Sequence, residues 1–158
     1  YLTRKEYDYA EKRIREAMRI APNYADGYGL LALIQAFRGQ PTNAIELNDK
    51  AIGLNPHFTF DYLITYGLAH YALGEYDAGI ERLEDAQERN PNAIQFKVLL
   101  AANYVRRGRQ DDAEWAADEI ELSSPATTVT GLQKAFPISD PELMRAFLHD
   151  LREAGLPE

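Results

Sequence analysis

The chain has 158 residues, of which 46% are hydrophobic and 27% are charged, and its formal net charge is −8. This length and composition predict one folded domain, and the negative charge disfavours nucleic acid and anionic membrane surfaces as partners. The absence of cysteine excludes disulfides, thiolate nucleophiles and cysteine-based zinc sites. The apolar runs are far shorter than the roughly 20 residues of a membrane-spanning helix. We therefore expect a cytoplasmic protein that does not insert into a membrane.

A period of about 34 residues runs through the first 125 positions. The prolines that close successive periods are 34, 35 and 34 residues apart: Pro22, Pro56, Pro91 and Pro125. A glycine precedes each of the last three prolines by 17 residues: Gly39, Gly74 and Gly108. Glycine suits the left-handed conformation that ends a helix, and proline suits the start of the next segment. Each period therefore predicts a helix, a turn and a second helix.

The second helices are expected over the runs that follow these glycines: Asn43–Leu54, Asp77–Arg89 and Asp111–Leu122. The first unit, residues 1–22, is only a half repeat, with a stub at 1–5 and one helix from Glu6 to Ile20. This incomplete unit predicts that the chain is a piece of a longer protein. Ile14, Ala17 and Met18 should pack on the next unit, and the face that a missing helix would cover should stay exposed.

Residues 126–158 leave the period. They predict a short helix over Thr127–Lys134, an extended joint at 136–138, and a helix over Pro141–Ala154 with Asp140 as its N-cap and Gly155 as its stop. Apolar side chains of the last helix recur at helical spacing: Leu143, Met144, Phe147, Leu148 and Leu151. The helix must therefore pack on another element, either as a cap on the last repeat or inside a groove.

The periodic part, residues 1–125, resembles the tetratricopeptide repeat. The third unit carries the residues of that pattern in order: Leu63, Gly67, Gly74, Tyr76, Leu83, Ala86 and Pro91. Gly79 replaces the usual alanine where helices cross, and it should loosen its helix relative to alanine. The resemblance implies an all-α fold, a right-handed superhelical solenoid of antiparallel helix pairs closed by the C-terminal extension.

The resemblance also implies a concave face that binds a partner protein. The residues of the first helices that map to this face are mostly apolar: Asp26, Leu30, Leu33, Phe37, Asp61, Thr65, Leu68, Tyr71, Gln95, Leu99, Ala102 and Arg106. Such a groove favours a helix or an extended apolar segment as partner, and the candidate anchors are Phe37, Leu68, Tyr71 and Leu99. The alternative is that residues 126–158 cover these side chains within the chain, because large apolar patches do not stay exposed.

Trp115 is the only tryptophan, and the equivalent positions of the other units hold Lys12, Glu46 and Glu81. Because that position normally faces water, we expect the C-terminal extension to cover Trp115. The second interpretation makes Trp115 an anchor of a protein interface.

The tail over residues 136–157 is similar to the C-terminus of bacterial class III adenylate and guanylate cyclases and of related regulators that carry repeats. That resemblance implies a non-catalytic region of a larger bacterial signalling or regulatory protein. The alternative function is homo-oligomerisation, through the uncovered first helix, that pairs an upstream catalytic domain.

Catalytic and metal-binding patterns are not found in the sequence. His57, His70 and His149 lack a metal-ligand spacing, and no phosphate loop or nucleophile elbow occurs. The carboxylates between residues 111 and 121 lie in a stretch without Lys or Arg and predict a solvated helix face, whereas the basic residues between 12 and 19 should pair with Glu11 and Glu16. We therefore expect no enzyme activity, cofactor or metal, but a protein-protein interaction module.

Overall fold

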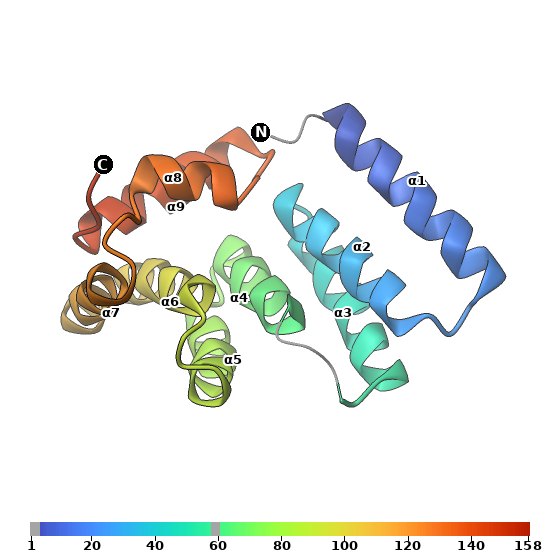
Figure 1. Ribbon diagram of the computed structural model, residues 1–158, viewed down its shortest axis with the longest axis horizontal. Helices are drawn as coiled ribbons and strands as arrows, with labels where there is room; N and C mark the ends of the chain where they lie inside the picture. Colours follow the sequence, from blue (N-terminus) through green and yellow to red (C-terminus); the bar gives the residue numbers. More distant parts are fainter. Residues whose placement is uncertain (1–3, 58–60) are drawn as a thin grey trace.

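The computed structural model describes residues 4–57 and 61–158, and these residues form nine helices and no strand (Figure 1). The helices follow one another along the chain with short connections: α1 (Arg4–Ile20), α2 (Ala25–Phe37), α3 (Pro41–Leu54), α4 (Asp61–Leu73), α5 (Tyr76–Arg89), α6 (Ile94–Arg107), α7 (Gln110–Ser123), α8 (Val129–Ala135) and α9 (Pro141–Glu153). The helix ends expected from the sequence agree with these bounds to within two residues, the first helix included.

The turns between paired helices are built as the glycines predict. Gly39, Gly74 and Gly108 have φ angles of 69°, 76° and 78°, in the left-handed region that a side chain disfavours. The amide that follows each glycine donates a hydrogen bond of 2.9 Å to a carbonyl five residues earlier. These bonds satisfy carbonyls at the helix ends and fold each pair into an antiparallel hairpin.

The hairpins stack into a solenoid because each buries its apolar face only against its neighbours. The first helices of successive units, α2, α4 and α6, pack against one another as well as against their own partners. Small residues are fully buried where helices cross: Ala44, Ala51, Ala86 and Ala113. The all-α solenoid expected from the repeat is therefore the observed fold.

Helix α1 is the least buried of the periodic helices. Tyr7 is buried, and its hydroxyl donates a hydrogen bond to the Pro137 carbonyl. Burial raises the pKa of Tyr7 to about 12, so the phenol is a protonated donor at neutral pH. Ile14 and Met18 are half-buried as expected, but Ala17 is exposed, so the expectation that it packs on the next unit is wrong.

Helices α8 and α9 return across the first helices of the solenoid (Figure 1). The Asp140 side chain accepts hydrogen bonds from the amides of Glu142 and Leu143, at 2.9 and 2.8 Å, and so caps α9. Gly155, with a φ of 101°, ends the helix. Both expected signals are thus confirmed. Within the described ranges, none of the helices has the length and apolar character needed to cross a membrane.

Candidate functional site: the concave face

The concave face of the third and fourth units is filled by α9. This helix packs against α6, and the ring of Phe147 meets that of Tyr71 edge-on at a centroid distance of 5.8 Å. Phe147 and Leu151 are fully buried, in one hydrophobic cluster with Leu68 and Leu99. The face that the sequence predicts for a partner is therefore occupied by the chain itself along these two units.

A buried carboxylate fixes the position of α9 on this face. Asp150, whose side chain is 2% exposed, accepts a hydrogen bond from the Tyr71 hydroxyl and another of 2.5 Å from Nε of Arg106. Desolvation and the bond to Asp150 both raise the pKa of Tyr71, which therefore stays a donor. Because a buried carboxylate without partners is costly, these two donors select one register of α9.

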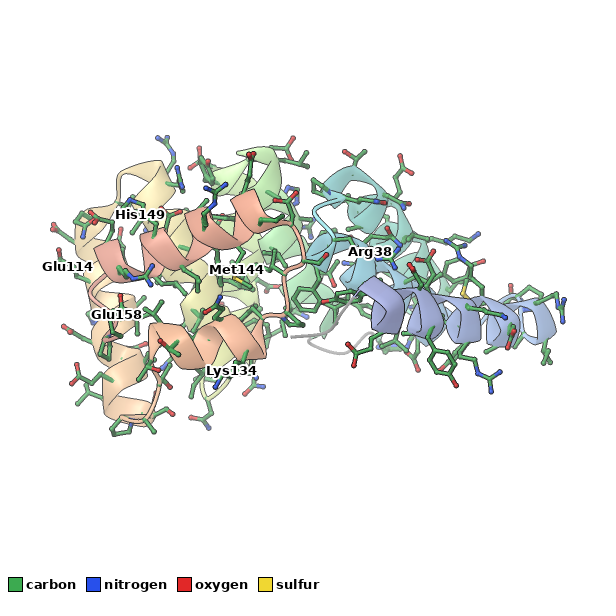
Figure 2. The ribbon with its side chains drawn as sticks, turned by 90° about the horizontal axis from the view of Figure 1, so that it is seen from above. Arg38, Glu114, Lys134, Met144, His149 and Glu158 are labelled. Carbon is green, nitrogen blue, oxygen red and sulfur yellow. The ribbon has the colours of Figure 1, made fainter. Side chains whose placement is uncertain are left out.

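The connection before α9 is tied to the second unit. The amide of Ser139 donates a hydrogen bond of 2.7 Å to the Phe37 carbonyl at the end of α2. A Cβ on Gly39 would lie 2.9 Å from Cβ of Asp140, so the turn after α2 and the N-cap of α9 are in close contact. The C-terminal extension thus reaches from α7 back to the first full repeat (Figure 2).

The candidate groove residues divide by unit. In the third and fourth units five are buried: Thr65, Leu68, Tyr71, Leu99 and Ala102. Gln95 and Arg106 are exposed, and the side chain of Asp61 lies outside the described part of the structure. In these two units the groove is covered by residues 126–158, which is the second of the two interpretations of the groove. Of the candidate anchors, Tyr71 contacts Phe147 of the C-terminal extension, and Leu68 and Leu99 lie in the same hydrophobic cluster as that residue.

The second unit keeps an open part of the face. Leu30 is 47% exposed, Leu33 and Phe37 are half-buried, and all three lie on one side of α2. Asp26 stands at the other end of this strip, exposed, and its carboxylate accepts a hydrogen bond of 3.0 Å from the Tyr62 hydroxyl. We call Asp26, Leu30, Leu33 and Phe37 the open strip.

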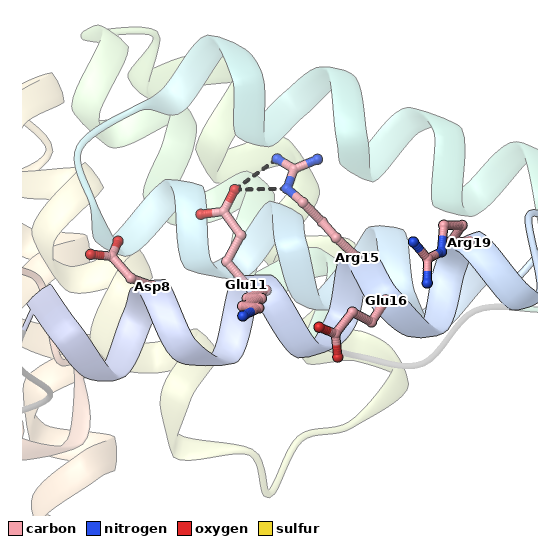
Figure 3. A pocket seen from close by; sticks show the side chains of 6 residues that line it. Asp8, Glu11, Arg15, Glu16 and Arg19 are labelled. Carbon is pink, nitrogen blue, oxygen red and sulfur yellow. Dashed lines mark hydrogen bonds and ion pairs between the residues drawn. The ribbon is translucent and has the colours of Figure 1, made fainter.

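A hollow lined by charged residues runs along α1 (Figure 3). Its acidic side chains have basic partners, as the sequence predicts for Glu11 and Glu16: Arg15 pairs with Glu11 at 2.7 Å and Arg13 with Glu16 at 2.9 Å. Arg38 at the end of α2 pairs with both Asp8 and Glu11, at 2.5 and 2.9 Å. The hollow is therefore better explained as the seam that holds α1 on α2 than as a binding site.

Trp115 is 59% exposed, so the expectation that the extension covers it is wrong. Helices α8 and α9 pack on other sides of the last unit, and Trp115 instead lines a shallow hollow with residues of α5, α6 and the loop between them: Glu84, Gln87, Glu88, Pro91 and Tyr104. Its role as an interface anchor stays a prediction.

Sequence reasoning missed the Asp150 clamp. A signal was present, because Asp150 follows Phe147 by three residues and precedes Leu151, and so falls on the apolar side of α9. A charge on such a face indicates a buried polar partner. In the described ranges, no group of three or more His, Cys, Asp or Glu side chains gathers closely enough to hold a metal ion.

Comparison with solved structures identifies a similar protein. The chain superposes on the crystal structure of MamA with a TM-score of 0.67 and 19% sequence identity, over 98% of this chain and 94% of that chain. The likeness shows a tetratricopeptide-type helical repeat fold. No protein-family model and no curated protein sequence matches the chain.

Proposed function

We propose that the chain is a non-catalytic protein-interaction module that binds a partner helix or an extended apolar segment along the open strip of α2. A tetratricopeptide-type solenoid is suited to this role, because its first helices present a continuous concave surface. We also propose that the chain is part of a larger bacterial signalling or regulatory protein, as the sequence leads us to expect.

The proposal rests on a contrast between two parts of the concave face, one covered by α9 and one left open. Helix α9 occupies the third and fourth units with an apolar side and a carboxylate clamp, and so shows how this surface receives a helix. The adjoining surface of α2 has the same apolar character, but Leu30 remains 47% exposed. Asp26 at its end would favour a partner residue with a positive charge.

The test changes the open strip without disturbing the core. Leu30→Glu places a charge on an exposed position and should abolish partner binding, whereas Leu54→Glu, at an exposed leucine of α3, should leave it intact. Each variant would be compared with the wild type by affinity purification and quantitative mass spectrometry, after thermal unfolding has shown that both fold. A photo-crosslinking amino acid at position 30 should also join the partner covalently. Equal recovery of the same proteins by both variants would contradict the proposal.

A further inference from the structure

The outer face of α7 combines exposed apolar and acidic side chains in one stripe. Its residues are spaced by four, three and four positions: Asp111, Trp115, Asp118 and Leu122. Trp115 is 59% exposed and Leu122 is 84% exposed, and Glu114 and Glu121 flank them. Shallow hollows lie beside both apolar residues, one lined by Trp115 and one by Leu122 and Pro125. We call the stripe and its two flanking glutamates the acidic face.

The charge of this face is not balanced within the chain. Helix α7 carries six acidic residues and no basic one. Asp112 and Glu119, which lie to the sides, pair with Arg109 at 2.6 Å and with Lys97 at 3.2 Å. Among the described residues, no basic side chain pairs with a carboxylate of the acidic face. An occupant should therefore be amphipathic and basic.

Helix α1 presents a matching stripe at the other end of the molecule. Its residues have the same spacing of four, three and four: Tyr9, Arg13, Glu16 and Ile20. Tyr9 is 65% exposed and Ile20 is 84% exposed. The helix has six basic and four acidic residues. Arg38, which follows α2, holds Asp8 and Glu11, and Arg13 pairs with Glu16 at 2.9 Å, so the outer side is left basic by Lys12 and Arg19. We call this surface the basic face.

We propose that the occupant of the acidic face is a second copy of the chain, whose α1 lies antiparallel on α7. In this orientation Tyr9 of one copy meets Leu122 of the other and Arg13 meets Asp118, while Glu16 lies against Trp115 and Ile20 against Asp111. Lys12 and Arg19 then point to the flanking glutamates. Three basic side chains of one copy thus face carboxylates of the other, and one pair of apolar side chains packs at the end of the contact.

The contact propagates from copy to copy. Helices α1 and α7 lie at opposite ends of the solenoid, so each copy offers one basic and one acidic face (Figure 1). A contact between two different faces leaves one of each free on every pair, and association continues into chains. A single pair of helices buries less surface than the roughly 1,200 Å² of a stable interface, so the association is weak and, because it is electrostatic, weakened by salt.

Light scattering from micromolar to millimolar protein measures this association. The weight-average mass should rise with concentration beyond that of a dimer at low salt and fall back at high salt. Trp115 is the only tryptophan and lies inside the contact, so its fluorescence should shift to the blue as the mass rises. Monomer at every concentration, or a rise in mass without that shift, would overturn the proposal.

Charge reversal tests the pairing itself. Asp118→Arg and Arg13→Glu should each keep the chain monomeric, because each places like charges across the contact. A mixture of the two should associate again, since Arg13 of the first variant meets Asp118 of the second. Glu46→Arg, on the exposed side of α3, changes the net charge by as much as Asp118→Arg does but leaves both faces intact, so this variant should still associate. Continued association of either single variant, or failure of the mixture, would reject the arrangement.

This inference is separate from partner binding at α2. Leu30→Glu leaves both faces unchanged, so that variant should associate normally even when it has lost its partner. The two proposals can therefore fail independently.

Discussion

Two helical glycines show how closely the helices approach one another. A Cβ on Gly79 in α5 would lie 2.8 Å from Oδ1 of Asn103 and 3.3 Å from Cβ of His70. Asn103 is fully buried and held by a hydrogen bond of 2.8 Å from its Nδ2 to the Leu99 carbonyl. Gly53 in α3 has no atom within 4 Å of the corresponding point. Helix propensity alone gives both glycines a similar cost relative to alanine, but only at Gly79 would a side chain meet a neighbouring helix.

The two alanine substitutions should therefore have opposite signs. Gly53→Ala should raise the free energy of unfolding by about 0.5–1 kcal/mol, the usual gain for alanine over glycine in a helix. Gly79→Ala should lower it by about 1 kcal/mol or more, because overpacking outweighs the same gain in propensity. Urea unfolding of both variants measures the difference. A stabilising Gly79→Ala would show that α6 yields at no cost.

At the scale of the element, α9 is held by its apolar side. Phe147 is fully buried and contacts the rings of Tyr71 and Phe136 at centroid distances of 5.8 and 5.3 Å. His149, on the opposite side of the same helix, is exposed. The docking of α9 on the solenoid therefore depends on one side of the helix alone.

Truncating these two side chains separates packing from helix propensity. Phe147→Ala should lower the free energy of unfolding by about 3–5 kcal/mol, because it removes a large buried ring and leaves a cavity. His149→Ala should change it by no more than about 0.5 kcal/mol, as exposed substitutions do. Chemical denaturation followed by circular dichroism provides both values. Comparable losses in the two variants would mean that α9 does not depend on the concave face.

The sequence predicts elements better than their contacts. Gly39 and Asp140 act locally, through a left-handed turn and a helix cap, so that a short stretch of sequence is enough to recognise them. The docking of α9 is not local: its apolar stripe shows which side is buried, but not which of several apolar surfaces receives it. Trp115 was misjudged for the same reason, because exposure depends on where distant helices come to rest.

At the scale of the whole molecule, packing is uneven from end to end. In α6 nine consecutive residues, from Phe96 to Tyr104, are buried. Of the positions from Glu6 to Ile20 in α1, only Tyr7 is buried. Since local stability follows buried contacts, α1 should open far more readily than the centre of the solenoid.

Hydrogen exchange measures this gradient. Amides of α1 should exchange much faster than those of α6, through an opening that leaves the remaining helices folded. Tyr7→Phe removes the hydrogen bond to the Pro137 carbonyl and should speed exchange in α1 alone. Tyr9→Phe, at a tyrosine that is 65% exposed, should leave the rates unchanged. Uniform protection across both helices would contradict this picture.

The return of the extension to the first repeat changes the mechanics of the molecule. A solenoid whose units touch only their neighbours bends and stretches like a spring, since small rotations add from one unit to the next. Here the hydrogen bonds from Ser139 to Phe37 and from Tyr71 to Asp150 connect the C-terminal extension to the second and third units of the solenoid. Extending the solenoid would require these bonds to break, so its pitch and curvature are fixed within the chain itself.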